Sequence, residues 1–253
     1  MKDNKLKKIS LLLSGGGSRG AYHLGIIKAL EELNFEICAI SGASIGSIVG
    51  ASYLSGKKPE EILEFFKKNS FKKAIKFNIF GGSLFRIDHD SAVFDELIDE
   101  KYKNIEDLPK PLYMSVTNIE KGFAEYKNSG NIKELACASS ALYPVFAPVI
   151  HNDEKLIDGG FVDNFPISPL LELKYPIFGV NLHPNFYNKK QFMLKRTIFL
   201  AWYMSGLHEK IKKCEYYLSS EKLTEHFILK TKGIENLFHL GYQNTLDLFD
   251  KNG

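Results

Sequence analysis

The chain has 253 residues, of which 44% are hydrophobic and 13% aromatic, a composition that supplies a core and excludes a disordered chain. Its net charge of +3 is too small to indicate nucleic-acid binding. Its three cysteines, at 38, 137 and 214, form no C-x-x-C pair, so neither a disulfide framework nor a cysteine zinc site is predicted.

The first predicted element is a buried strand in "ISLLL" (9–13), followed by a glycine loop and a helix. The lysines before this strand resemble a signal peptide. However, the apolar patch is short and runs into the loop instead of a cleavage site. Gly15, Gly17 and Gly20 match the G-x-G-x-x-G spacing of a dinucleotide site. The loop therefore directs backbone N–H groups at an anion.

The second predicted strand, "FEICAI" (35–40), argues against a nucleotide as that anion. No Asp or Glu lies at its end to bind a ribose, and no G-K-[ST] follows the loop. Instead, Gly42-Ala43-Ser44-Ile45-Gly46 reads G-x-S-x-G between a strand and an apolar helix. That context is typical of a nucleophile elbow, so we predict Ser44 as a nucleophile and an oxyanion as the anion that the loop serves.

The next helix begins near Pro59, and the segment 64–85 then interleaves lysines with phenylalanines. The lysines are at 67, 68, 72, 73 and 76. One interpretation is a surface helix whose aromatic residues pack inward. The other is a mobile flap, hinged at Gly81 and Gly82, that contacts an anionic membrane.

Further strands are predicted at 111–119, 124–128 and 175–183, with a hairpin of 144–150 and 155–158 around "HNDE". From 189 onward the pattern is mostly helical, and the apolar residues 199–207 suggest a core or subunit-contact helix. No window reaches the run of about 18 apolar residues of a membrane span. Apolar strands that alternate with helices predict an α/β fold, with a mainly parallel sheet covered on both faces.

A serine nucleophile needs a base. Asp158 ends the strand "KLID" and precedes Gly159 and Gly160, which permit close approach of another backbone. The same residues also fit an ordinary Asp-Gly turn. Asp163 is a weaker alternative for the base. For a triad with histidine, His183 at the end of its strand comes first and His239 second. His151 is expected to be exposed in the hairpin turn.

Three motifs in this order, "GGGSRG" (15–20), "GASIG" (42–46) and "DGG" (158–160), resemble the patatin-like phospholipase family. The segment "ASSALYPVFAPV" (138–149) supports the resemblance, and Ala43 and the second glycine of "DGG" depart from the family's more frequent Thr and Ala. The resemblance implies a three-layer α/β fold, with Ser44 as nucleophile and Asp158 as general base in a dyad without histidine. It also implies turn glycines at Gly42, Gly46, Gly159 and Gly160. The implied oxyanion hole is the loop Gly15, Gly16, Gly17, Ser18, Arg19 and Gly20, formed by the backbone amides around Gly16 and Gly17, with Arg19 assisting electrostatically.

The expected function is hydrolysis of lipid esters, of phospholipase A, lysophospholipase or esterase type, through an acyl-enzyme. No cofactor and no metal are expected. The chain is expected to be one domain (1–253), with its motifs in 9–180 and a mostly helical part at 189–250. We expect a cytoplasmic protein that contacts an anionic membrane peripherally through 64–85. The alternatives are a Ser-Asp-His esterase, an acyltransferase, and a non-catalytic lipid- or nucleotide-binding module. The sequence does not indicate an oligomeric state.

Overall fold

The computed structural model of the chain describes residues 6–68, 70–78, 82–184, 206–227 and 230–250, and the isolated positions 193, 197, 201 and 204. Its central sheet has the strand order β10-β9-β1-β2-β5-β8-β7, with β6 also paired to β5. The strands are β1 (Lys7–Leu13), β2 (Phe35–Ala43), β5 (Leu112–Asn118), β6 (Phe123–Lys127), β7 (Val149–His151), β8 (Glu154–Asp158), β9 (Ile177–Val180) and β10 (Tyr216–Leu218). The strands from β10 to β5 pair in parallel, whereas β6, β7 and β8 are antiparallel to their partners.

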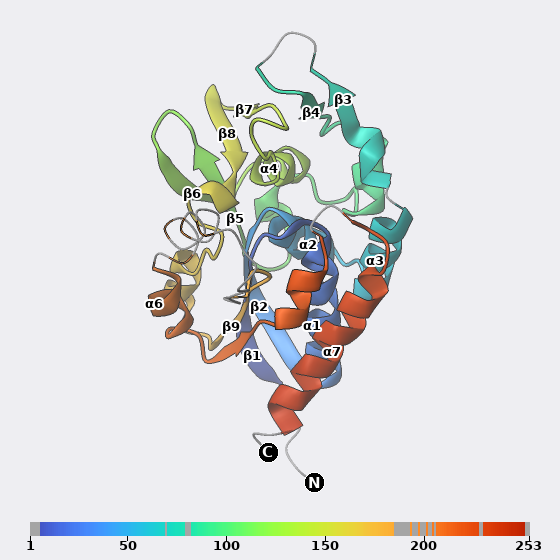
Figure 1. The fold of residues 1–253 in the computed structure, drawn as a ribbon, viewed down its shortest axis with the longest axis vertical. Coiled ribbons are helices and arrows are strands. Elements are labelled where there is room, and N and C mark those ends of the chain that lie inside the picture. The colour runs from blue at the N-terminus through green and yellow to red at the C-terminus, as the bar shows by residue number, and fades with distance from the viewer. Residues whose placement is uncertain are drawn as a thin grey trace.

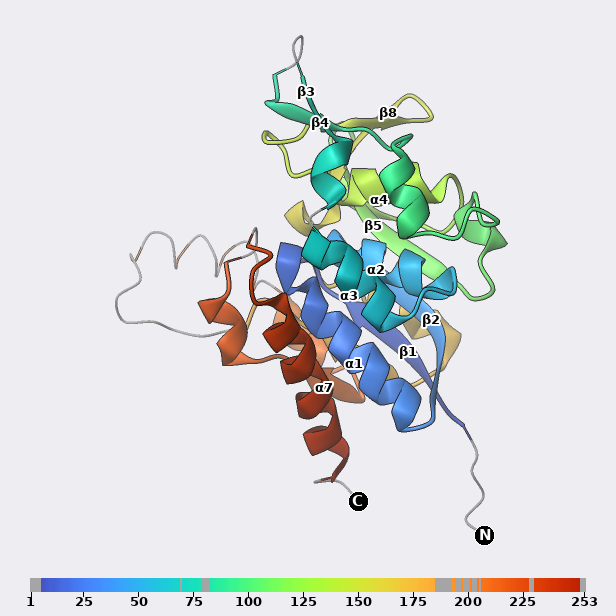
Figure 2. The ribbon, with the colours of Figure 1, turned by 90° about the vertical axis from the view of Figure 1, so that its right-hand side faces the viewer.

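Helices cover both faces of this sheet, as the sequence predicted (Figures 1 and 2). One face carries α1 (Ala21–Glu32), α2 (Ile45–Leu54), α3 (Pro59–Lys68), α4 (Ile132–Ser139) and α7 (Ile234–Asp250). The other carries α6 (Leu207–Ile211) and the 3-10 helix η6 (Ser168–Leu173). The described residues also form the short helices η1 (Gly17–Gly20), η2 (Ser70–Ala74), η3 (Ala92–Glu96), η4 (Ile105–Asp107), η5 (Gly159–Phe161) and η7 (Glu221–Glu225).

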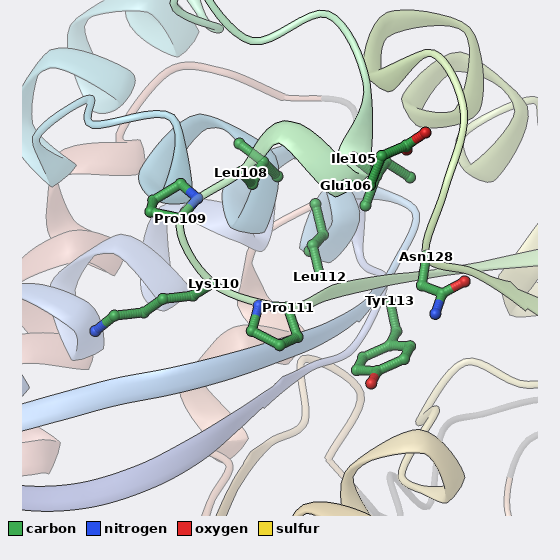
Figure 3. Close-up of a pocket in the computed structure, with 9 residues that line it drawn as sticks. All are labelled: Ile105, Glu106, Leu108, Pro109, Lys110, Pro111, Leu112, Tyr113 and Asn128. Atoms are coloured by element: carbon green, nitrogen blue, oxygen red, sulfur yellow. The ribbon is translucent and has the colours of Figure 1, made fainter.

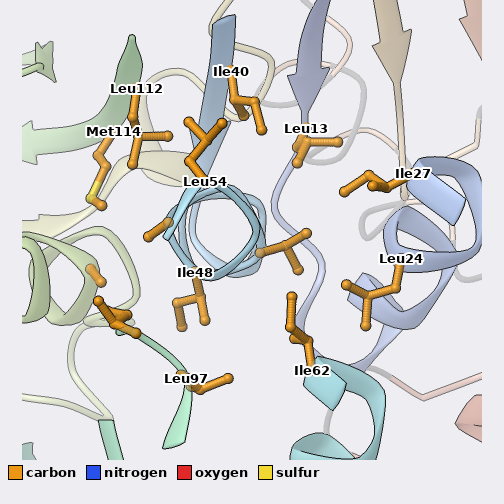
Figure 4. Close-up of a cluster of buried hydrophobic side chains, with 14 of the residues drawn as sticks. Leu13, Leu24, Ile27, Ile40, Ile48, Leu54, Ile62, Leu97, Leu112 and Met114 are labelled. Atoms are coloured by element: carbon orange, nitrogen blue, oxygen red, sulfur yellow. The ribbon is translucent and has the colours of Figure 1, made fainter. Parts of the chain in front are cut away.

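Strand β1 supplies side chains to both cores because successive residues of a strand point to opposite faces. Leu11 and Leu13 belong to the larger core, and Leu12 between them belongs to the smaller one. The larger core surrounds α2 (Figure 4). Its members around α2 include Leu13, Leu24, Ile27, Ile40, Ile62, Leu112 and Met114. Each fully buried side chain of this size stabilises the fold by about 1.5–3 kcal/mol, so the buried half of β1 contributes to both cores.

The predicted strands at 35–40, 111–119, 124–128 and 175–183 are confirmed, with ends displaced by a few residues. The hairpin around "HNDE" is also confirmed. Asn152 and Asp153 occupy its turn with positive φ, as a tight hairpin turn requires. The expectation for His151 is wrong. Its side chain is buried because α4 packs over it, and its Nδ1 lies 3.2 Å from Glu134 Oε1.

The segment 64–85 is not one surface helix, so that interpretation is wrong. Helix α3 ends at Lys68, and after η2 the chain forms a two-stranded hairpin of β3 (Ile75–Phe77) and β4 (Phe85–Ile87). Its strands alternate apolar and basic residues with the period of two that favours a strand. Gly81, one of the two expected hinge residues, lies outside the described residues.

The described C-terminal part is helical in α6, η7 and α7, but it also contains β10, which the sequence pattern did not predict. Most of 199–207 lies outside the described residues. Among the helices that the structure describes, none is long and apolar enough to cross a membrane.

Candidate active site

Ser44 lies at the sharp turn between β2 and α2, with φ 52° and ψ −122°. A non-glycine residue with this φ is strained and is typical of a nucleophile elbow. The turn is too tight for side chains on its neighbours. A Cβ on Gly42 would lie 2.5 Å from the Gly46 carbonyl carbon, and one on Gly46 would lie 2.2 Å from the Leu13 oxygen. Ser44 is therefore raised at the carboxyl edge of the sheet, at the N-terminus of α2.

Buried hydroxyl groups hold the backbone of Ser44 in place. Its amide donates to Ser139 Oγ at 2.9 Å, and that hydroxyl donates to the Ser115 carbonyl at 2.7 Å. Ser47 Oγ lies 2.8 Å from the same oxygen of Ser139. Residues of α2, α4 and β5 thus meet beneath the turn.

Asp158 ends β8 with its side chain beside Ser44. Burial raises the pKa of this carboxyl to about 6, opposed by hydrogen bonds from the Gly160 amide and the Ser44 side chain. The Gly160 amide donates to Asp158 Oδ1 at 2.7 Å. The chain after Asp158 passes so close to β5 that a Cβ on Gly159 would lie 2.2 Å from the Ser115 oxygen. The structure therefore joins a serine hydroxyl to a buried carboxylate of raised basicity.

The glycine loop lies directly against Ser44, because a Cβ on Gly15 would be 3.0 Å from Ser44 Cβ. The Gly15 amide donates to Asn164 Oδ1 at 3.0 Å, and Asn164 Nδ2 donates back to the Gly15 carbonyl at 3.4 Å. The Arg19 amide donates to the Gly16 carbonyl at 3.3 Å. The amides of Gly15 and Arg19 are thus engaged within the protein. Gly16 and Gly17 stand at the start of η1, where helical amides have no acceptor within the helix.

The side chains of the loop are tied to distant segments. Arg19 Nε donates to the His226 carbonyl at 2.9 Å, and Arg19 Nη1 donates to the Leu182 carbonyl at 3.1 Å. Ser18 Oγ donates to the Phe227 carbonyl at 3.3 Å. At Gly20, a Cβ would lie 2.4 Å from the Ile45 side chain. Arg19, which the resemblance placed in an electrostatic role, thus fastens the loop to the chain beyond β9 and η7.

Of the two histidines considered for a triad, His183 contacts the glycine loop and His239 is exposed. His183 hydrogen-bonds to the backbone of Gly15, and its pKa is lowered to about 4 by burial and by the charge of Arg19. It is therefore neutral at pH 7 and directed at the glycine loop. His239 is exposed on α7. The hydrogen bonds described above for the Asp158 carboxylate come from Gly160 and Ser44.

Asp163, the weaker alternative to Asp158, is engaged elsewhere. Lys210 Nζ lies 2.6 Å from its Oδ1, and the Tyr126 hydroxyl donates to its Oδ2 at 2.7 Å. Such pairing of a buried carboxylate with a cation is the expected way to stabilise its charge. We assign Asp163 to structure.

Sequence reasoning missed three residues of this site. Ser139 and Asn164 contact Ser44 and Gly15 as described above. His23, fully buried in α1, hydrogen-bonds to the Ser14 carbonyl at 2.8 Å just before the glycine loop, and burial lowers its pKa to about 4. Ser139 lies within the segment already quoted for the resemblance, and Asn164 follows "DGG" by four residues. For Ser139 and Asn164, the one signal in the sequence is that each lies near a motif of the site.

A shallow pocket of about 300 Å³ lies elsewhere, around Lys110 and Tyr113 at the amino end of β5 (Figure 3). Lys110 there donates to the Ile37 carbonyl at 2.7 Å. Ser44 instead follows the carboxyl end of β2, so this pocket is not part of the site. In the described part of the chain, no three His, Cys, Asp or Glu residues are grouped to hold a metal ion.

The chain is similar in sequence to known proteins. A family model described as patatin-like phospholipase matches residues 11–171. Lysophospholipase NTE1 of Cryptococcus neoformans is 34% identical over 178 residues, covering 66% of this chain and 10% of that protein. Lysophospholipase NTE1 of Kluyveromyces lactis is 34% identical over 176 residues, covering 65% and 12%. The chain thus spans about a tenth of the length of these curated relatives.

Among solved structures, VipD from Legionella pneumophila superposes with a TM-score of 0.55 at 15% sequence identity. The match covers 98% of this chain and 67% of that chain. At this identity the likeness concerns the fold, and it agrees with a mainly parallel sheet that is covered on both faces.

Proposed function

The chain belongs to the patatin-like phospholipase family, and from this premise we propose that it is a lipid acyl hydrolase that cleaves carboxylic esters at Ser44. One observation carries the proposal: the Ser44 side chain hydrogen-bonds to the buried carboxylate of Asp158, whose pKa is about 6. A base with a pKa near the working pH can both accept and return a proton. Serine alone is a poor nucleophile until such a base removes its proton.

In the proposed first half-reaction, Asp158 accepts the proton of Ser44 Oγ as that oxygen attacks the ester carbonyl carbon. The carbonyl oxygen takes up the negative charge of the tetrahedral intermediate. When the carbon–oxygen bond to the alcohol breaks, the leaving alkoxide takes the proton from Asp158. In the second half, water attacks the acyl-enzyme, Asp158 accepts its proton and returns it to Ser44, and the fatty acid leaves.

We place the oxyanion beside the amides of Gly16 and Gly17, with support from the helix dipole at the N-terminus of α2. The Gly15 and Arg19 amides already donate within the protein, whereas Gly16 and Gly17 lie at the start of η1, where helical amides have no acceptor within the helix. The other loop residues then have positioning roles. Gly15 is held by Asn164, and Ser18 and Arg19 are held by the chain around His226.

The substrate class that we propose is a phospholipid or lysophospholipid, in line with the curated relatives, which are named lysophospholipases. We further propose that the chain acts in the cytoplasm, at the surface of a membrane without crossing it. We also propose that its motif-bearing part and its C-terminal part form one domain, since α7 packs along α1 and β9 pairs with β1.

Covalent labelling tests the proposal. A fluorophosphonate probe should label the wild-type protein and should not label the Ser44→Ala variant. Ser52→Ala is a matched control, because Ser52 is a buried serine of α2 that bonds to the Ile48 carbonyl and not to the site. Equal labelling of wild type and Ser44→Ala would refute the nucleophile. Release of fatty acid from lysophosphatidylcholine by wild type alone would support the lipid class.

Two other functions remain to be separated by experiment. Acyl transfer shares the acyl-enzyme and differs in the acceptor, so it predicts labelling together with a second lipid product. A non-catalytic nucleotide-binding module predicts binding of a dinucleotide and no labelling. The engaged Gly15 amide and the absence of an acidic residue at the end of β2 favour the hydrolase over this module.

A further inference from the structure

The hairpin β3–β4 and the segment 142–147 form one surface, which we call the hairpin platform. The Phe85 amide donates to the Val145 carbonyl at 2.9 Å, and the Ala147 amide donates to the Phe85 carbonyl at 2.7 Å. The rings of Phe85 and Phe146 lie 6.3 Å apart. Figures 1 and 2 show the hairpin at the end of the molecule opposite to both termini. The platform is therefore held together by backbone pairing as well as by side chains.

This platform exposes large apolar side chains. Phe77 is 78% exposed and Leu84 is 66% exposed. Four successive apolar or aromatic residues, at 142–145, are exposed as well. Single exposed apolar residues need no explanation, but a contiguous group usually marks a contact with another molecule or with a membrane.

Basic side chains accompany the apolar ones. Lys72, Lys73, Lys76 and Arg86 are exposed, and none of them forms an ion pair with another described residue. The sequence contains no Asp or Glu from 65 to 87. In the hairpin, Lys76 stands directly opposite Arg86. Like charges in this position are destabilising, and an anion bound between them would remove the repulsion.

The platform adjoins the site. The amide of Asp158, the proposed base, donates to the Ala141 carbonyl at 3.0 Å. The exposed segment 142–145 begins at the next residue of the chain. Ser139, which holds the Ser44 amide, lies two residues before Ala141. Residues 142–145 therefore follow directly in the chain after the residues that contact the backbones of Ser44 and Asp158.

We propose that the hairpin platform docks on a bilayer that contains anionic phospholipid, and that it thereby directs the active site at the lipid surface. Phe77, Leu84 and residues 142–145 enter the interfacial region, while the basic side chains meet the headgroup phosphates. The apolar area alone would also suit a second copy of this chain. The unpaired positive charge favours the anionic bilayer, because an identical copy presents the same positive charge. The proposal rests on the proposed function for its lipid substrate.

Vesicle co-sedimentation tests the proposal, with Ser44→Ala as the background so that no lipid is consumed. Binding is measured on phosphatidylcholine vesicles with and without phosphatidylglycerol. Lys76→Glu should weaken binding to the anionic vesicles at least about fivefold, since each basic residue near such a surface contributes roughly 1 kcal/mol. The new carboxylate would face Arg86, so the hairpin should be no less stable, and unfolding cannot account for the loss. Lys7→Glu makes the same change of charge at an exposed position near the termini and should bind like the parent.

A second pair of variants tests the apolar part. Phe77→Ser should weaken binding to both kinds of vesicle. Leu171→Ser should not, because Leu171 is an exposed residue of η6, on the sheet face opposite to α1. Equal binding of Lys76→Glu and Lys7→Glu to anionic vesicles would overturn the proposal. So would a dimer in sedimentation velocity that Phe77→Ser abolishes while vesicle binding persists.

Failure of the docking surface and failure of the proposed function give different results. Hydrolysis of soluble p-nitrophenyl butyrate by Lys76→Glu with Ser44 intact should equal that of wild type. A wild type that hydrolyses no ester but still binds anionic vesicles through the platform would refute the hydrolase and leave the docking surface standing. A wild type that hydrolyses the soluble ester but does not bind the vesicles would refute the docking surface and leave the proposed hydrolase standing.

Discussion

The Ser44 amide donates a hydrogen bond to Ser139 Oγ at 2.9 Å, although 95 residues separate the two in the chain. Ser44 holds a backbone conformation that serine seldom adopts, and such strain persists only where the surroundings enforce it. Ser139 is one such restraint, because its hydroxyl is anchored in turn to the Ser115 carbonyl of β5. The proposed nucleophile is thus positioned from outside its own motif.

Ser139→Ala should therefore lower both stability and activity. Removing the Ser139 hydroxyl leaves the Ser44 amide without this acceptor, which costs about 1–3 kcal/mol. Ser52→Ala also loses a buried hydroxyl and should affect the melting temperature but not kcat. Thermal unfolding and ester hydrolysis measure the two effects. If the two variants lose kcat equally, Ser139 has no positioning role.

The pH dependence of ester hydrolysis should report Asp158. A general base works when it is deprotonated, so kcat/KM should rise through about pH 6 and then level off. His183→Ala should keep this profile and an activity well above that of Ser44→Ala, because His183 contacts the glycine loop and is already neutral above about pH 4. The Ser-Asp-His alternative would be favoured if His183→Ala lost the rise of kcat/KM near pH 6, or lost all activity.

Asp158→Asn should inactivate the protein and stabilise it at neutral pH. The folded-state pKa of Asp158, about 6, lies above the unfolded value near 3.8. Protonation therefore favours the folded state, and wild-type stability falls as the pH rises from about 4 to above 6. Asparagine removes this penalty, so the variant should gain on the order of 2–3 kcal/mol at pH 8 and almost nothing at pH 4. Urea unfolding at both pH values measures the difference; a gain of the same size at pH 4 would contradict it.

Gly15→Ala should impair catalysis because there is no room for a methyl group. The new Cβ would lie 2.4 Å from Asn164 Oδ1 and would displace the loop from Ser44. A misplacement of about 1 Å near reacting groups can cost on the order of a hundredfold in rate. At Gly82 a Cβ would meet nothing within 4 Å, so Gly82→Ala should hydrolyse a soluble ester like wild type. Normal rates in Gly15→Ala would remove the loop from the mechanism.

Arg19→Lys distinguishes a positioning role of Arg19, in which it acts as a tether through its hydrogen bonds, from an electrostatic role of its charge. The two carbonyl contacts of Arg19 use different nitrogens of one planar group, which lysine cannot reproduce. If Arg19 acts as a tether, Lys and Met should both reduce the free energy of unfolding, by about 1–3 kcal/mol, and should lower kcat to a similar extent. Full recovery of kcat in Arg19→Lys, compared with Arg19→Met, would instead show that its charge acts in the reaction.

The sequence predicted the parts of this site that are local. Ser44 follows the end of β2 and Asp158 ends β8, each within a short motif, so the sequence alone could propose both. The two cores follow from the opposite directions in which the neighbouring residues Leu11, Leu12 and Leu13 point. Ser139 and Asn164 could not, since their roles depend on partners 95 and 149 residues away. A serine in a helix and an asparagine in a loop carry no periodic pattern that would reveal such partners.

The two wrong predictions, for His151 and for the segment 64–85, have the same origin. His151 stands in a predicted turn, and it is buried because Glu134 of α4 comes to meet it. The lysines and phenylalanines of 64–85 suggested one surface helix, but the register of Ile75, Lys76 and Phe77 against β4 places them in a hairpin instead. In both cases a tertiary neighbour decided the outcome.

The pairing of β9 with β1 limits how this chain can be shortened. The family model ends at residue 171, six residues before β9 begins at Ile177. A fragment cut at that point would leave Ser10, Leu11, Leu12 and Leu13 paired with β2 on one side and without the strand β9 on the other. An uncovered apolar edge of this kind recruits strands from other molecules. Such a fragment would carry all three motifs and would still aggregate, so expression trials should retain the chain through α7.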